Sequence, residues 1–191
     1  MPRNYSLGRR QGAVDRTRLR ILAAAREVLA TGEPGLSAGA VARRAGVSRI
    51  TVYNQFGSKA GLLRELADGA HNRVSGDSSE PDDPRDQLRK RLSDSCAVWS
   101  SDPALFRRLP QELEVRKPDN DKALAERLGA ADQLRPGCSL TEAADVIGAI
   151  TSFEVFDRLH KDGRRSQAAV VEILMRLAST ILRAGPASQV T

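Results

Sequence analysis

The chain has 191 residues, with 30 Lys and Arg against 24 Asp and Glu, so its net charge at pH 7 is +6. Charged residues make up 28% and apolar residues 40%, proportions that exclude a wholly disordered chain. The length suits one large domain or two small ones. No apolar run approaches the ~20 residues of a membrane-spanning helix. The first residues lack a signal-peptide core, and the two cysteines, Cys96 and Cys138, fit a reducing compartment. We therefore expect a cytoplasmic protein with no membrane partner.

The positive charge is concentrated in the first part of the chain. Residues 1–75 contain 13 Lys and Arg and 5 Asp and Glu, whereas residues 76–191 contain 17 and 19. Twelve of those 13 cations are arginines, whose planar guanidinium suits phosphate groups and guanine edges. This asymmetry predicts that a polyanion docks on one end of the protein. The alternative is a basic surface with no partner.

Helical periodicity runs through the chain, and no segment alternates like a β-strand. The expected helices, in chain order, are residues 15–31, two short segments capped by Ser37 and Ser48, a segment from Ser58, a segment that ends at Asp102-Pro103, one from Pro103, and residues 120–134, 140–160 and 166–183. Each of the last two helices is apolar on two sides, which indicates that a second copy of the chain covers one of these sides.

The elements predict an all-α protein in two parts with about nine helices. Residues 1–12 are expected to form a flexible basic arm with Arg3, Arg9 and Arg10. Residues 13–74 would form a helix-turn-helix domain of three helices and its connecting helix. The segment SGDSSEPDDP, residues 75–84, is expected to be an acidic loop. Residues 85–185 would form a second helical domain, and residues 186–191 a tail.

A helix-turn-helix pattern occupies residues 37–56, SAGAVARRAGVSRITVYNQF. Ala42 is small where the two helices would cross, Gly46 lies at the turn, and valines hold the pair together. The longer stretch from Ala42 to Leu63 closely resembles the DNA-binding domain of the tetracycline-repressor (TetR/AcrR) transcriptional regulators. The resemblance covers roughly residues 13–65. Its matching residues are Ala42, Ala45, Gly46, Val47, Ser48, Tyr53, Phe56, Lys59, Leu62 and Leu63.

The resemblance implies a function for each of the two parts. The N-terminal domain would read a palindromic operator on double-stranded DNA as a homodimer. The C-terminal domain would dimerise and bind a small-molecule effector, which releases the DNA by moving the two reading helices apart. The protein would then be a repressor. Outside residues 13–65 the chain matches the family only in length, helical content and its two-sided last helices.

The polar face of the second motif helix predicts the base contacts: Ser48, Arg49, Thr51, Asn54 and Gln55. By resemblance, the phosphate contacts are Ser37, Tyr53 and Lys59, to which we add Arg43 and Arg44. Two positions depart from the family pattern. Ile50 stands where a small residue is usual, so it either contacts a thymine methyl group or packs inside. Gln55 replaces an aromatic residue or a histidine, which puts its backbone contact in doubt.

The second part yields candidates for an effector pocket and for the dimer interface. The pocket candidates are Cys96, Trp99, Phe106, Phe153, Glu154 and Phe156, with ordinary core packing as the alternative. If Glu154 is buried, it needs a partner such as Arg108, Arg158 or a cationic ligand. The interface candidates are Ile147, Ile150, Val170, Leu174, Leu177 and Ile181.

Other function classes find little support in the residues. The chain has no GxGxxG, GxxxxGK[ST], HExxH or CxxC motif, so we expect no enzyme, no cofactor and no metal. A protein that coats DNA without sequence preference would bind all duplexes alike, with a steep dependence on salt. A module that binds acidic proteins would bind no duplex at low salt.

Overall fold

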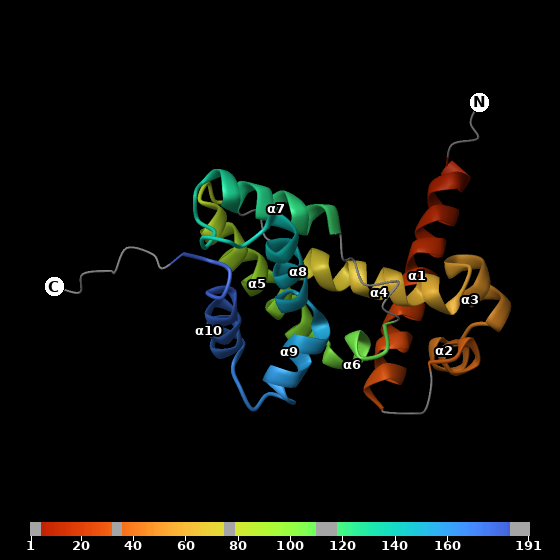
Figure 1. The fold of residues 1–191 in the computed structure, drawn as a ribbon. Coiled ribbons are helices and arrows are strands. Elements are labelled where there is room, and N and C mark those ends of the chain that lie inside the picture. The colour runs from red at the N-terminus through yellow and green to blue at the C-terminus, as the bar shows by residue number, and fades with distance from the viewer. Residues whose placement is uncertain (1–4, 32–35, 75–78, 110–117, 184–191) are drawn as a thin grey trace. The chain divides into compact units, whose positions relative to one another are not determined.

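A computed structural model describes residues 5–31, 36–74, 79–109 and 118–183, and within them the chain is helical apart from one isolated β-bridge, Leu134 to Leu182. The described helices are α1 (Tyr5–Ala30), α2 (Ala38–Ala45), α3 (Arg49–Phe56), α4 (Lys59–Val74), α5 (Pro84–Ser101), α6 (Pro103–Phe106), α7 (Pro118–Ala130), α8 (Leu140–Ile150), α9 (Phe153–His160) and α10 (Gln167–Ala178) (Figure 1). The predicted all-α class is therefore confirmed.

The chain divides into two compact units. Unit 1 consists of Met1–Ala70 together with Ala104–Glu114, and unit 2 of His71–Pro103 together with Val115–Thr191. The sequence placed the boundary in the loop at residues 75–84. The contacts place it instead inside α4, after Ala70, and assign the segment after Pro103 to unit 1. Because α4 continues through the boundary between the units, the composition of the sequence does not change there.

Unit 1 is built on the long helix α1, against which α2 packs, and α2 in turn packs against α3. Its core is aliphatic, with residues such as Ile21 and Leu29 of α1, Val41 of α2, and Leu63 and Leu66 of α4 at most 2% exposed. These positions recur at three or four residues, the spacing that places side chains on one helix face. A small aliphatic core thus joins α1, the short helices α2 and α3, and the first part of α4.

The structure corrects the predicted N-terminal arm. Helix α1 begins at Tyr5, ten residues before the predicted start at Asp15, so Arg9 and Arg10 belong to a helix. Arg3 lies outside the described residues. The segment before Asp15 contains no proline, and its glycines weaken a helix without ending it. The prediction of a flexible arm over residues 1–12 is wrong for residues 5–12.

Unit 2 packs α5 against α7, α9 and α10, and α8 against α7, α9 and α10. Helix α5 starts sharply because the Asp83 side chain accepts hydrogen bonds from the backbone N–H groups of Arg85 (2.7 Å) and Asp86 (3.2 Å), with Pro84 in the first turn. Near the start of α5, where Gln133 donates to the Asp83 side chain (2.8 Å), backbone hydrogen bonds of 2.8 Å join residues 133–135 to residues 181–183. These bonds tie the segment after α10 to the segment after α7.

The helix predicted over residues 140–160 is two helices. After Ile150, the Thr151 hydroxyl donates to the carbonyl of Ile147 (2.7 Å) and the Ser152 hydroxyl to that of Ala149 (2.8 Å). Ser152 has extended backbone angles and begins α9. Hydroxyl side chains that bond nearby backbone groups compete with the helix. Apolar periodicity continued through the break and so concealed it.

The predicted dimer interface also needs correction. Five of its six residues are buried in the core of unit 2 within a single chain, at 0–5% exposure: Ile147, Ile150, Val170, Leu174 and Ile181. They cannot form the surface that meets a second copy, because α5, α8 and α9 of the same chain already pack around α10. Leu177 alone among the six is exposed, at 44%. The two-sided pattern was correct, but the side that remains uncovered was misjudged.

Candidate nucleic-acid interface

Three short helices of unit 1 meet at capped turns, as the helix-turn-helix pattern predicts. The Ser37 hydroxyl accepts from the backbone N–H of Ala40 (3.1 Å), and the Ser48 hydroxyl from that of Thr51 (3.0 Å), so each serine caps a helix. Gly46 adopts the left-handed conformation (φ 63°, ψ 41°) that ends α2. Val47 N–H then donates back to the carbonyl of Ala42 (3.0 Å). The turn between α2 and α3 therefore has a single defined geometry.

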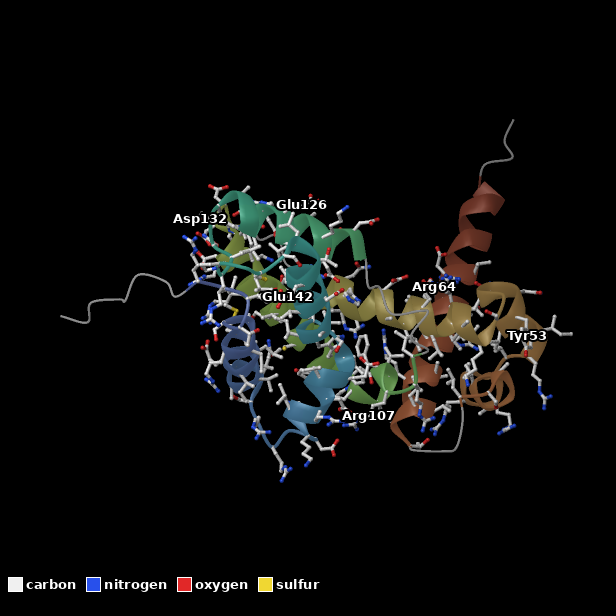
Figure 2. The ribbon with its side chains drawn as sticks, in the orientation of Figure 1. Tyr53, Arg64, Arg107, Glu126, Asp132 and Glu142 are labelled. Atoms are coloured by element: carbon white, nitrogen blue, oxygen red, sulfur yellow. The ribbon has the colours of Figure 1, made fainter. Side chains whose placement is uncertain are left out.

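The exposed face of α3 differs from the predicted one. Arg49, Ile50, Tyr53 and Asn54 are exposed, and their spacing of one, four and five residues places them on one side of the helix. We call these four residues the reading face. Ile50 is 71% exposed and Tyr53 53%, and Tyr53 projects outward from unit 1 in Figure 2. Of the two alternatives for Ile50, packing inside is therefore excluded.

Two predicted base contacts lie off this face. Thr51 and Gln55 are half-buried, on the same side of α3 as the buried Val52. The Thr51 hydroxyl is 2.9 Å from the Ser48 hydroxyl, so both groups already take part in the helix cap. Which residues of α3 are exposed depends on how the helix is rotated about its axis. That rotation follows from tertiary packing, which the sequence of eight residues does not specify.

Two arginines of α1 hold the helix pair in place, Arg18 at the end of α3 and Arg20 at the end of α2, and sequence reasoning missed both. Arg18 donates to the carbonyl of Gln55 (2.7 Å), forms an ion pair with Glu65 (2.7 Å) and lies 4.6 Å from the centroid of the Phe56 ring. Arg20 donates to the carbonyl of Ala45 (2.8 Å), at the end of α2. Both carbonyls lie in a last helical turn, where a cation is favoured. Nothing in the sequence separates these arginines from Arg16 or Arg26.

Four of the predicted phosphate contacts lie before or after α3 in the sequence. Ser37, Arg43, Arg44 and Lys59 are all exposed. Lys59 is the first residue of α4, whose N-terminus is capped by Ser58 accepting from the N–H of Gly61 (3.0 Å). Arg44 forms an ion pair with Glu27 (3.3 Å), which reduces the positive charge that it offers to a ligand. Arg49 lies against Gly39 of α2, where an added Cβ would be 3.1 Å from its Nε.

Most of the predicted effector-pocket residues in unit 2 pack against one another. The Trp99 ring lies 6.1 Å from that of Phe153 and 5.4 Å from that of Phe156, and His160 stacks on Phe156 at 5.0 Å. Cys96 is fully buried, and this burial raises the pKa of its thiol to about 12. Ordinary core packing, the alternative reading of these residues, describes their positions.

Two members of that set are placed differently from the expectation. Glu154 is exposed, so it is not a buried carboxylate in need of a partner. It is the second residue of α9 and lies on the side of that helix opposite the core residues Phe153 and Phe156. Phe106 belongs to unit 1, whereas the other five residues belong to unit 2.

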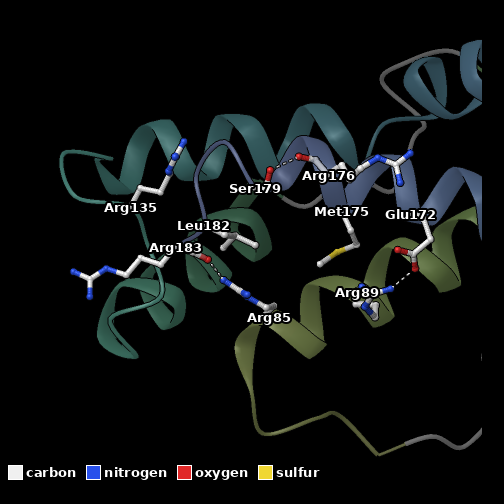
Figure 3. A pocket seen from close by; sticks show the side chains of 9 residues that line it. All are labelled: Arg85, Arg89, Arg135, Glu172, Met175, Arg176, Ser179, Leu182 and Arg183. Atoms are coloured by element: carbon white, nitrogen blue, oxygen red, sulfur yellow. Dashed lines mark hydrogen bonds and ion pairs between the residues drawn. The ribbon is translucent and has the colours of Figure 1, made fainter. Parts of the chain in front are cut away.

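A cavity of about 470 Å³ lies elsewhere in unit 2, between α5 and α10 (Figure 3). Five arginines line it: Arg85, Arg89, Arg135, Arg176 and Arg183. Figure 3 shows Met175 directed from α10 toward α5 inside this space. Three of the arginines have partners within the unit. Arg89 pairs with Glu172 (2.5 Å), Arg183 pairs with Asp132 (2.5 Å), and Arg85 donates to the carbonyl of residue 183. None of the six predicted pocket residues lines this cavity.

Comparison with known proteins finds a family model that matches this part of the chain. Residues 21–66, which run from α1 through the turn to α4, match the model of bacterial regulatory proteins of the tetR family. This part of the chain is therefore similar to the tetR family of bacterial regulatory proteins. The match supports a DNA-binding transcriptional regulator in which α2 and α3 are the helix-turn-helix pair. None of the curated proteins compared with the chain is similar to it in sequence.

Solved structures share the fold over most of the chain. NalD of Pseudomonas aeruginosa, the secondary repressor of the MexAB-OprM multidrug efflux pump, is 22% identical with a TM-score of 0.61, over 90% of this chain and 98% of NalD. FadR of Bacillus subtilis, solved with stearoyl-CoA, is 19% identical with a TM-score of 0.63, over 84% and 96%. A TetR-family regulator of Chloroflexus aurantiacus is 18% identical with a TM-score of 0.61, over 89% and 95%. At these identities the likeness concerns the fold.

None of the described helices combines the length and the apolar composition that crossing a membrane requires.

Proposed function

We propose that this protein is a tetR-family regulator that binds a palindromic operator as a homodimer and represses transcription until a small molecule releases it. The observation that carries the DNA-binding part is the reading face, a row of exposed side chains on a short helix that is capped at its start by Ser48 and anchored at its end by Arg18. A helix of this kind fits a major groove about 12 Å wide. NalD, a repressor with the same fold, supports the repressor role.

Within this proposal, Arg49 and Asn54 read bases. The guanidinium of Arg49 can donate to O6 and N7 of guanine, and the amide of Asn54 can pair with N6 and N7 of adenine. Ser48, Thr51 and Gln55 take a lesser part, because the two hydroxyl groups serve the helix cap and Thr51 and Gln55 are half-buried.

Phosphate contacts come from Tyr53 of the reading face and from residues beside that face. Lys59 is exposed at the capped N-terminus of α4, where free N–H groups also favour an anion. Tyr53 is half-exposed and can donate its hydroxyl, and Ser37 and Arg43 are exposed on the neighbouring helix α2 and its cap. Such contacts position a protein on DNA and carry little sequence information.

A pair of substitutions separates these roles. On a selected operator, Arg49→Ala is expected to relax the preference at one base pair per half-site and to cost about 1–3 kcal/mol of binding free energy. Lys59→Ala is expected to weaken binding to all duplexes by a similar factor and to lower the salt dependence. Binding measured against a library of operator variants distinguishes the two patterns. If both variants lose affinity without any change in base preference, Arg49 does not read a base.

The homodimer is proposed to form through the uncovered side of α10. Ala169, Ile173 and Leu177 recur every four residues on one face of this helix, and they are exposed, half-buried and 44% exposed respectively. This face lies beside the core face that carries Val170 and Leu174. An apolar stripe of this kind at the end of the chain suits a symmetric helix-to-helix contact, in which each copy offers the same surface.

The effector is proposed to be an anionic molecule that binds in the arginine-lined cavity. Its volume lies within the range of about 300–1,000 Å³ typical of small-molecule sites. Arg135 and Arg176 have no ion pair within residues 79–109 and 118–183, so their charge is free to meet an anion. FadR, which has the same fold, was solved with stearoyl-CoA, an anionic ligand.

Replacing Arg135 and Arg176 together by Ala should abolish release of the operator by anionic compounds while leaving operator affinity unchanged. The matched control is Arg164→Ala, which removes an exposed arginine of unit 2 that does not line the cavity. A screen of anionic and neutral metabolites for release of a labelled operator measures both. Release that is equally strong in the double variant would place the effector elsewhere.

A further inference from the structure

The second residue of α3 is an exposed isoleucine, and this calls for a physical reason. Ile50 is 71% exposed, the highest value among the large apolar side chains of the described residues that are exposed. Burying such a side chain would contribute about 1.5–3 kcal/mol, so its exposure forgoes a stabilising contribution. A single exposed apolar residue is common on a protein surface, but this one lies within a polar row on a DNA-binding helix.

The surroundings of Ile50 hold it in a fixed direction. It lies between Arg49 and Asn54 on the reading face, with Tyr53 one turn further along the helix. The helix itself is fixed at its start by the Ser48 cap and at its end by the hydrogen bond from Arg18 to the carbonyl of Gln55. A β-branched side chain also has few rotamers in a helix. Ile50 therefore presents its aliphatic surface with little conformational freedom.

Only one group in the major groove is apolar, the C5 methyl group of thymine. The other base edges in that groove offer hydrogen-bond donors and acceptors, which an isoleucine cannot satisfy. We infer that Ile50 contacts a thymine methyl group in each half-site and makes the protein select thymine at that position. This inference rests on the proposal that α3 enters the major groove.

The neighbours of Ile50 place this thymine within a short stretch of base pairs. Arg49 suits guanine and Asn54 suits adenine, and both flank Ile50 on the same helix face. The reading face thus combines the guanidinium of Arg49, the aliphatic side chain of Ile50 and the amide of Asn54. The expected half-site contains a guanine, a thymine and an adenine within the few base pairs that one recognition helix covers.

The test compares thymidine with deoxyuridine, which lacks only the C5 methyl group. The full-length protein is first used to select an operator from randomised duplexes, and each thymine of the half-site is then replaced by uracil. For the wild-type protein, one replacement should lower affinity about fourfold in one half-site and about sixteenfold in both, since a buried methyl group contributes that much. For Ile50→Ala, the same replacement should change nothing.

The control variant is Leu19→Ala, which removes an exposed apolar side chain (65%) from α1 of the same unit. It should keep the full preference for thymine over uracil. Because Ile50 and Leu19 are both exposed, both variants should retain the helical signal and unfolding temperature of the wild type.

The outcomes separate this inference from the proposed function. If an operator is selected but tolerates uracil at every thymine, Ile50 does not read a methyl group, while the DNA-binding proposal stands. Preference for thymine that persists in Ile50→Ala overturns the inference in the same way. If no duplex is enriched, the proposal that α3 reads DNA fails, and the inference fails with it.

Discussion

Arg18 is the residue on which the position of the recognition helix most depends. It connects α1 to the last turn of α3 and to α4 through one hydrogen bond, one ion pair and one ring contact. Charged hydrogen bonds of this partly buried kind contribute more than an exposed ion pair. No sequence pattern marks Arg18, because its partners lie 37 and 47 residues away.

We predict that Arg18→Ala lowers the free energy of unfolding by about 2 kcal/mol. It should also weaken binding to all operators without altering base preference, since Arg18 supports the reading face and does not belong to it. Urea unfolding and a binding series measure the two effects. The control is Arg44→Ala, whose half-exposed ion pair with Glu27 should contribute less than about 0.5 kcal/mol. Equal losses of unfolding free energy in the two variants would contradict the anchoring role.

Cys96 is predicted to be chemically inert in the folded protein. Burial raises the pKa of its thiol to about 12, and only the thiolate reacts. At pH 8 a disulfide reagent should therefore modify the half-exposed Cys138 first and reach Cys96 only after unfolding. The folded pKa lies above the ordinary value of 9.0, so the neutral thiol contributes fully below pH 9, and stability falls as the pH rises beyond it. Rapid labelling of Cys96 at pH 8 would contradict this.

At the scale of elements, the corner between α3 and α4 leaves no room at Gly61. A Cβ on this residue would come 2.1 Å from the carbonyl oxygen of Phe56, which is backbone and cannot move aside cheaply. Gly61 lies in the first turn of α4, next to the Ser58 cap. A glycine in the first turn of a helix is not itself a signal, so the sequence did not reveal this close approach.

Gly61→Ala is predicted to cost about 2 kcal/mol of stability and to abolish specific DNA binding, because it displaces α3 relative to α4. Its control is Gly12→Ala in α1, where the new Cβ meets only the Arg16 side chain at 3.7 Å. That exchange should stabilise the helix by about 0.5–1 kcal/mol. Thermal unfolding and operator binding measure both. Full operator affinity in Gly61→Ala would show that the corner does not set the position of α3.

Caps and turns were the elements best predicted from sequence. Ser37, Gly46 and Ser48 take the predicted roles, because a cap depends on residues within one helical turn. The extension of α1 to Tyr5, the break before α9 and the rotation of α3 were not predicted. The break depends on competition from hydroxyl groups and the rotation on contacts between elements, and apolar spacing reports neither.

At the scale of the whole molecule, the sequence assigned the dimer contact to positions of α10 that belong to the core of a single chain. Val170 and Leu174 are fully buried within one chain, so Val170→Glu is expected to unfold unit 2 and not to yield a folded monomer. The uncovered face with Ile173 and Leu177 is the better candidate. A sequence shows that a helix is apolar on two sides, but not which side its own chain covers.

The double variant Ile173→Glu, Leu177→Glu is predicted to be a folded monomer with much weaker operator binding, because two carboxylates would face each other across the symmetric contact. Light scattering after size exclusion gives the mass, and circular dichroism reports the helical content. Val14→Glu, at an apolar residue of α1 with similar exposure (43%), should leave the assembly unchanged. A double variant that remains dimeric would move the interface to another surface.

Selection from randomised duplexes, followed by a footprint of the enriched sequence, tests most directly whether α3 reads a specific operator in a homodimer. For a homodimer that reads DNA through α3, we expect a two-fold symmetric sequence, protected in two major-groove segments separated by a whole number of helical turns. It also predicts that Arg49→Ala relaxes the sequence at one base pair in each half. Binding that is equal for all duplexes and depends steeply on salt, or no binding to any duplex at low salt, would contradict it.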